Sequence, residues 1–216
     1  MFTNTDVSQI LNLPHVYSKI IYNPTSQNFL VSCPYPSTVL YVLDKRFREI
    51  DSLLINFDDS CFQVEDIWLD LELDIILIAT PFKIYKFNYN SDLLGTFMSA
   101  SKGIKYRAIC TYRQFAFLAY EKYGSLYISS YTSQGAYLER ICLGSEYSIK
   151  NLQVIIDQGY PILRAYVIKS SNFPYMVEIE LECEEKRSND LQNYNNIRIE
   201  LVSEDPDLKP SCHVNE

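Results

Sequence analysis

The side chains of this 216-residue chain that could do chemistry are carboxylates. Asp66 and Asp70 stand on either side of a short apolar segment, and Asp157 holds a comparable place later in the chain. Acidic residues gathered at one mouth of a channel can bind a metal ion or cleave a glycosidic bond, so these three form a candidate acidic site. The interpretation we favour is that Asp66 and Asp70 bracket a strand and accept hydrogen bonds from nearby backbone N–H groups.

Other catalytic chemistry has little support in the sequence. A hydrolase triad needs a histidine as its general base. The two histidines, His15 and His213, lie outside the repeating part of the chain, so we expect no such triad. The sequence has no GxSxG, phosphate-loop or GxGxxG motif. The six cysteines form no CxxC pair, and we expect reduced structural thiols. We therefore expect no cofactor, no bound metal and no enzymatic activity.

The elements that would position the acidic side chains repeat along the chain. Residues 65–99 alternate apolar runs with short polar turns, which predicts four antiparallel strands. Similar blocks lie at residues 19–54, 108–143 and 154–203, and one constant offset aligns the first two strands of successive blocks. In each block the second strand is a largely apolar run, which is typical of a strand covered on both faces.

These repeats set the expected domain boundaries. Residues 16–203 are expected to form one repeat domain, preceded by an N-terminal lead-in at residues 1–15. Residues 204–216 are acidic and contain two prolines, which predicts a disordered tail. The polar stretch 182–196 is expected to be an exposed loop between the last two strands.

Blocks of four short strands, repeated every 41 to 47 residues, resemble the repeats of β-propellers, loosely those of the WD40 family. The resemblance is architectural, because the Gly-His and Trp-Asp signature of that family is absent and the lone Trp68 falls in a first strand. It implies an all-β fold of about four blades, each of four antiparallel strands, and a general role as a binding platform. The blocks either close alone into a small ring, or need another chain to complete the ring, or are a shortened form of a longer propeller.

The overall charge narrows the choice of partner. A formal net charge of −8 and a pI near 4.9 disfavour nucleic acid as a ligand. The basic clusters 45–48 and 102–107 are expected in solvated turns. No apolar stretch reaches the length of a membrane span, and the first residues lack a signal-peptide pattern, so we expect the cytoplasm or the nucleus.

These observations predict a non-catalytic platform for protein–protein interaction, a subunit of an intracellular complex. The partner is expected to be a protein, and its expected contact surfaces are the turns at one propeller end and the exposed edge of the terminal blade. Residues in those turns are Asn23, Gln27, Lys45, Arg46 and Glu72. Self-association through an open blade edge is a further possibility. Two alternatives stay open: a propeller enzyme with the acidic site named above, and a shortened relative of a larger propeller with little independent function.

Overall fold

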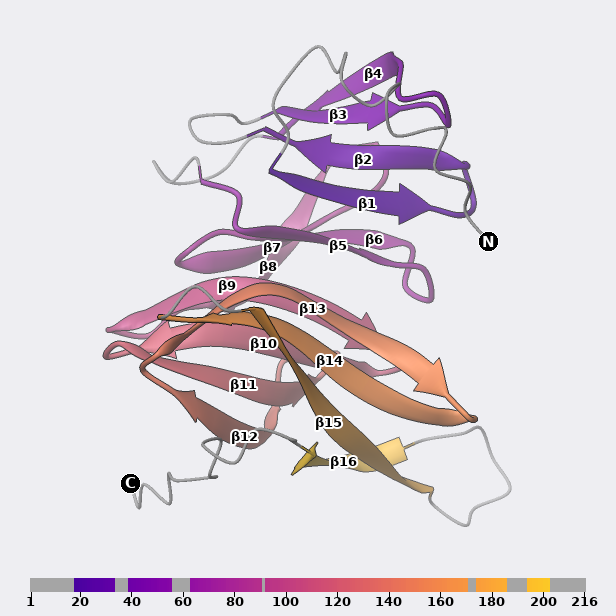
Figure 1. Cartoon of the computed structure of the whole chain (residues 1–216). Coiled ribbons are helices and arrows are strands. Elements are labelled where there is room, and N and C mark those ends of the chain that lie inside the picture. The colour runs from indigo at the N-terminus through magenta and orange to yellow at the C-terminus, as the bar shows by residue number, and fades with distance from the viewer. Residues whose placement is uncertain are drawn as a thin grey trace.

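The computed structural model describes residues 18–33, 39–55, 63–90, 92–170, 174–185 and 194–202. Within these ranges the regular structure consists of β-strands, arranged as four sheets of four antiparallel strands (Figure 1). The described residues contain no helix that is long and apolar enough to cross a membrane. The prediction of an all-β, propeller-like fold of four blades is confirmed.

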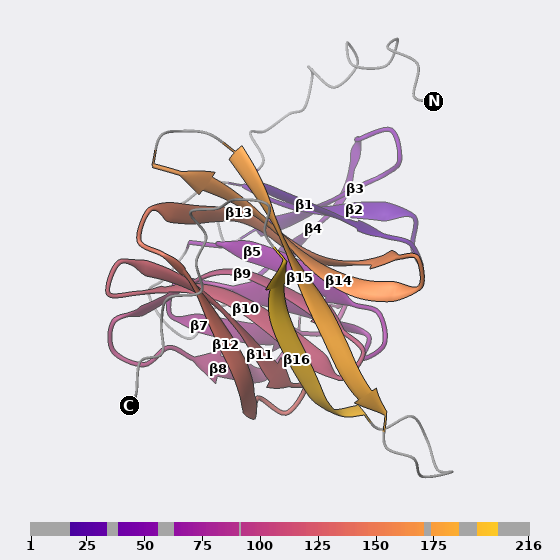
Figure 2. The ribbon, with the colours of Figure 1, turned by 60° about the horizontal axis from the view of Figure 1, so that its bottom comes forward.

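Each sheet is a meander in which strands that follow each other in sequence are paired. The predicted lead-in 1–15 and tail 204–216 lie outside the described residues. Blade 1 contains β1 (Lys19–Asn23), β2 (Asn28–Ser32), β3 (Val39–Leu43) and β4 (Glu49–Leu54), and blade 2 contains β5 (Asp66–Asp70), β6 (Ile75–Ala79), β7 (Lys83–Phe87) and β8 (Leu93–Ser99). Blade 3 contains β9 (Ile104–Tyr112), β10 (Phe115–Lys122), β11 (Ser125–Thr132) and β12 (Tyr137–Gly144), and blade 4 contains β13 (Tyr147–Asp157), β14 (Tyr160–Lys169), β15 (Pro174–Glu185) and β16 (Tyr194–Val202). Figure 2 shows β15 as the long orange ribbon that crosses the view.

The turn after the first strand of each blade has a common backbone feature. Gln27, Asp74, Arg113 and Gln158 lie in these four turns, and each has a φ between 49° and 56°. Gln27 and Asp74 come directly before the second strand, whereas Arg113 and Gln158 come directly after the first. A left-handed conformation is uncommon for residues other than glycine. The turns of blades 1 and 2 therefore match each other, with four residues each, and so do the two-residue turns of blades 3 and 4.

Apolar cores hold neighbouring blades together. One buried cluster joins blades 1 and 2 and contains Leu30, Leu40, Ile76 and Phe87. A second lies between blades 2 and 3, and a third, the largest, between blades 3 and 4. Among the described residues no such cluster joins blade 4 to blade 1. The first and last blades are instead connected near the centre by a polar contact described below.

Three sequence predictions need correction. Strand β9 begins at Ile104, so most of the basic stretch 102–107 lies in a strand and not in a turn. Its residues pair with β10, where Tyr106 lies opposite Tyr120. Strand β13 begins at Tyr147, seven residues before the predicted start of the fourth block at Val154. The polar stretch predicted as a loop also contributes to strands, because β15 continues to Glu185 and β16 begins at Tyr194.

Candidate functional site

Asp66 lies where the first strands of the four blades meet. One carboxylate oxygen of Asp66 is 3.3 Å from Nζ of Lys19 in β1, and the other accepts a hydrogen bond of 3.0 Å from the backbone N–H of Ile109 in β9. The same Lys19 ammonium donates a 3.0 Å hydrogen bond to the carbonyl oxygen of Lys150 in β13. One ion pair and two hydrogen bonds thus connect all four first strands. We call Lys19, Asp66 and their two backbone partners the axis network.

The environment of Asp66 fits a structural role. The residue is only 5% exposed. Burial raises the pKa of Asp66, and the charge of Lys19 and the N–H of Ile109 partly oppose that increase. A buried carboxylate that already contacts a lysine and a backbone N–H is poorly accessible to a metal ion or a substrate. Its contacts instead join blade 2 to blades 1 and 3, and Lys19 extends the network to blade 4.

Asp70 and Asp157 lie elsewhere. Asp70 ends β5, roughly 13 Å along the strand from Asp66 at the usual rise per residue. Its carboxylate accepts hydrogen bonds from the backbone N–H groups of Glu72 and Leu73, at 3.1 and 3.0 Å. Asp157 is exposed at the end of β13 in blade 4. The structure does not bring the three carboxylates together, and no cluster of three metal-ligating side chains occurs within the described ranges.

The turn that Asp70 supports is repeated in blade 1. There the side-chain oxygen of Asn23 accepts hydrogen bonds from the backbone N–H groups of Thr25 and Ser26, at 2.9 and 3.3 Å. Asn23 and Asp70 occupy the same position in their blades. An amide and a carboxylate that perform the same task indicate that the position needs an acceptor for the turn and no charge.

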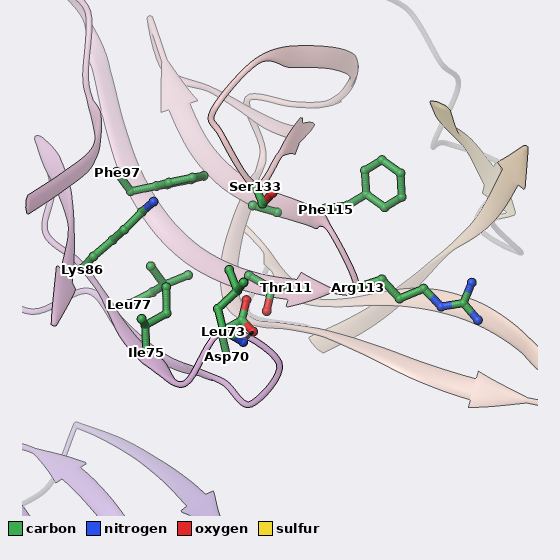
Figure 3. Close-up of a pocket in the computed structure, with 11 residues that line it drawn as sticks. Asp70, Leu73, Ile75, Leu77, Lys86, Phe97, Thr111, Arg113, Phe115 and Ser133 are labelled. Carbon is green, nitrogen blue, oxygen red and sulfur yellow. Dashed lines mark hydrogen bonds between the residues drawn. The ribbon is translucent and has the colours of Figure 1, made fainter. Parts of the chain in front are cut away.

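A small cavity lies between blades 2 and 3, beside Asp70 (Figure 3). Its volume is about 10 Å³, which is about the space of one water molecule. In Figure 3, Lys86 lies beside Phe97 and Arg113 points away from this group, and Nζ of Lys86 is 4.9 Å from the centre of the Phe97 ring. This cavity is too small for an organic ligand.

A much larger cleft opens between blades 1 and 2. Its volume is about 460 Å³, within the usual range for ligand sites. It lies at the propeller end that carries the β1–β2 and β5–β6 turns. We call it the blade 1–2 cleft, and its lining consists of Asn23, Thr25, Ser26, Asn28, Phe29, Leu30, Val42, Asp51, Leu53, Asp74, Ile76 and Tyr89.

The cleft has apolar walls and an acidic opening. Leu30 and Ile76 are buried and belong to the core between blades 1 and 2. Asp51 and Asp74 are exposed, and the lining contains no lysine or arginine. The Tyr89 hydroxyl is buried and has no hydrogen-bond partner within the described part of the chain. Burial raises the pKa of Tyr89, with a further increase from Asp74 and Asp70, so its hydroxyl stays protonated at neutral pH.

The turn residues selected from the sequence lie around this end of the molecule. Asn23 lines the cleft, and Gln27 and Glu72 belong to the two turns that border it. Lys45 and Arg46 lie in the β3–β4 turn of blade 1. Their role in binding stays a prediction.

The β3–β4 turn is organised by an acid. Asp44 accepts hydrogen bonds from the backbone N–H groups of Arg46 and Arg48, and its carboxylate also pairs with the Arg48 guanidinium at 2.6 Å. The hydrogen bonds from Arg48 are the main reason that the pKa of Asp44 falls to about 2.

Sequence reasoning missed the lining residues outside the β1–β2 and β5–β6 turns, and three of them are Asp51, Leu53 and Tyr89. They come from β4 and from the segment after β7, and they meet only because blade 1 packs on blade 2. Side chains alternate between the two faces of a strand, so the sequence of β4 does indicate that Asp51 and Leu53 share one face.

Both terminal blades leave apolar side chains exposed on their outward faces. In blade 1, residues that alternate with the core side chains leave Ile20, Tyr22 and Leu54 exposed. In blade 4 the corresponding face carries an ion pair of 2.7 Å between Arg164 and Glu178. Tyr166 and Met176 are also partly exposed on this blade 4 face, so both outward faces combine apolar and polar side chains.

Comparison with known proteins supports the fold but indicates no activity. No protein-family profile matches the chain, and no characterised protein matches it in sequence. Among solved structures, Raptor from Chaetomium thermophilum is similar with a TM-score of 0.52 and 14% identity, over 75% of this chain and 15% of Raptor. The WD40 domain of Pan2 from Neurospora crassa gives 0.49 and 6%, over 87% of this chain and 61% of that domain. The RRP9 WD40 repeats give 0.49 and 7%, over 76% and 57%.

The four sheets of four antiparallel strands form a β-propeller-like fold, and the similarity to Raptor concerns this fold. The chain spans less than two thirds of the length of each of these three structures. At such identities the likeness concerns the fold alone, so what this propeller binds has to be argued from its own surface.

Proposed function

We propose that this propeller is a non-catalytic platform that binds a segment of another protein in the blade 1–2 cleft. The main support for this proposal is the cleft itself, because its volume of about 460 Å³ can accommodate one or two side chains of a partner. Its apolar walls supply the binding surface, and exposed turn residues form its rim. The propeller fold supports the proposal because propellers commonly present binding surfaces at the ends of their blades.

Two of the three carboxylates that would serve an enzyme hold the fold, and the third lies apart from them. Asp66 belongs to the axis network and Asp70 to a turn, while Asp157 is exposed on another blade. No observation on the described residues favours the acidic enzyme over the platform. We further propose that the platform works as a subunit of an assembly in the cytoplasm or the nucleus.

Site-specific photo-crosslinking tests this function. A photoreactive residue replaces Ser26, on the rim of the cleft, or Tyr123, which is 80% exposed in the β10–β11 turn at the opposite end of the propeller. The cleft-filling variant Thr25→Trp serves as the second control, since the Thr25 side chain is exposed and its backbone hydrogen bond is retained.

We expect a partner protein that crosslinks from Ser26, fails to crosslink from Tyr123 and is lost in the Thr25→Trp background. Equal crosslinking from both positions, or crosslinking that persists in the Thr25→Trp variant, would show that the cleft is not the binding site.

A further inference from the structure

The charges around the blade 1–2 cleft are unbalanced. Asp51 and Asp74 line it, and neither forms an ion pair within the described part of the chain. Asp51 accepts one local hydrogen bond, from the backbone N–H of Ser52, which leaves most of its acceptor capacity unused. A ligand that brings positive charge to this opening would therefore gain two carboxylate partners without displacing an internal one.

The inner part of the cleft is apolar. Its walls include Leu30 and Ile76, which belong to the core between blades 1 and 2, and Val42, which packs against that core. The Tyr89 hydroxyl adds one polar group that is buried and unsatisfied within the described residues. A ligand that fits both parts needs an apolar stem, a cationic group near the opening and a hydrogen-bonding group within reach of Tyr89.

We propose that the blade 1–2 cleft recognises a basic side chain, arginine or lysine, on an extended segment of the partner protein. The aliphatic stem lies against Leu30, Val42 and Ile76, and the cationic head lies between Asp51 and Asp74. Both basic side chains pack their stems on apolar surface while the head stays near water. The chain's net charge of −8 also attracts basic segments and repels acidic ones. This inference rests on the proposed function and specifies the chemistry of its partner.

Other side chains satisfy the cleft less well. A purely apolar side chain would pack against the walls of the cleft. It would also partly desolvate the two carboxylates without pairing with them, which costs binding free energy. An acidic side chain would meet repulsion from Asp51 and Asp74. Only a cationic amphipathic group uses the walls and the opening together.

Two matched peptides test the inference on the whole chain. The first is labelled acetyl-Gly-Leu-Arg-Leu-Gly-amide, and the second replaces arginine by citrulline, which keeps the shape and removes the charge. Fluorescence anisotropy gives the affinity of each peptide for the wild type, for the Asp51→Asn/Asp74→Asn variant and for the control Asp157→Asn/Glu180→Gln, whose two residues lie on blade 4. The control removes two exposed carboxylates that do not line the cleft.

We expect the arginine peptide to bind at least about tenfold more tightly than the citrulline peptide, as hydrogen bonds to charged groups predict. The preference should fall below about twofold in Asp51→Asn/Asp74→Asn, persist in the control and weaken as salt is added. Equal affinity of the two peptides for the wild type overturns the inference. If both peptides then still lose affinity in the Thr25→Trp variant, the cleft binds peptides without charge recognition and the proposed function stands. If neither peptide binds, the inference also falls, and the crosslinking experiment alone decides the proposed function.

Discussion

Replacing Lys19 by methionine tests whether the axis network holds the four blades together. Methionine keeps much of the apolar stem and removes the ammonium that contacts Asp66 and the Lys150 carbonyl. The side chains of Lys19 and Asp66 are 23% and 7% exposed, so the ion pair is largely desolvated. Removing one partner of a buried ion pair costs about 3–5 kcal/mol. Because Lys19 is partly solvated and Asp66 keeps its bond from Ile109, we expect about 3 kcal/mol at neutral pH.

The loss should depend on pH with a definite sign. Burial already raises the pKa of Asp66, and Lys19 opposes this increase, so removing Lys19 raises the pKa of Asp66 further. Aspartate in the unfolded chain has a pKa of about 3.9, so above about pH 4 the folded variant binds more protons than the unfolded one. Its free energy of unfolding therefore falls as the pH rises, until the pH passes the folded pKa. Relative to wild type, the variant is least impaired near pH 4 and most impaired at neutral pH.

Denaturant unfolding at several pH values, followed by fluorescence, measures this loss. Lys150→Met is the matched control, because it removes an exposed ammonium and keeps the backbone carbonyl that Lys19 contacts. Substitutions of this kind usually change stability by no more than about 0.5 kcal/mol. If Lys19→Met is as stable as Lys150→Met near pH 7.5, or if its loss is the same near pH 4.5, the assignment of the axis network is wrong.

Three further predictions concern the core, a contact between blades and the exposed face of blade 1. Phe117→Ala, in the core between blades 3 and 4, should destabilise the chain by about 3–5 kcal/mol, whereas Tyr123→Ala should stay within about 0.5 kcal/mol in the same thermal unfolding assay. Trp68→Phe removes a hydrogen bond of 2.8 Å between blades 2 and 3 and should cost about 1 kcal/mol in denaturant unfolding; an unchanged midpoint would refute that value. The wild type should bind a dye specific for apolar surface, and Ile20→Lys/Leu54→Lys should reduce the signal; undiminished binding would place the exposed apolar surface elsewhere.

Much of the fold follows from local sequence patterns. The offset that aligns Lys19–Asn23 with Asp66–Asp70 also aligns Asn28–Ser32 with Ile75–Ala79, and the structure has strands with these bounds. Such agreement is expected where short apolar strands are bounded by polar turns, because both signals lie within a few residues. Asp70 was correctly interpreted as a turn acceptor for the same reason, whereas that interpretation was wrong for Asp66, whose partners Lys19 and Ile109 lie far away in sequence.

The errors arose where distant partners decide the structure. Arg107 looked like part of a basic turn, but in β9 its guanidinium forms ion pairs of 2.9 Å with Glu65 and Glu121, which come from blade 2 and from β10. Those partners make a charged residue compatible with a strand, and no local pattern reveals them. The same limit applies to the blade 1–2 cleft, whose lining residues lie far apart in sequence.

The most direct test of the account is a methyl NMR titration of the whole chain with the arginine peptide. Binding in the blade 1–2 cleft predicts saturable shifts for the methyl groups of Val42, Leu53 and Ile76, which line the cleft, and unchanged signals for Leu163 and Val177, which lie in the core between blades 3 and 4. Binding of the peptide that leaves the three cleft residues unshifted, or that shifts the methyl groups of blade 4 instead, would contradict the claim that this propeller binds its partner between blades 1 and 2.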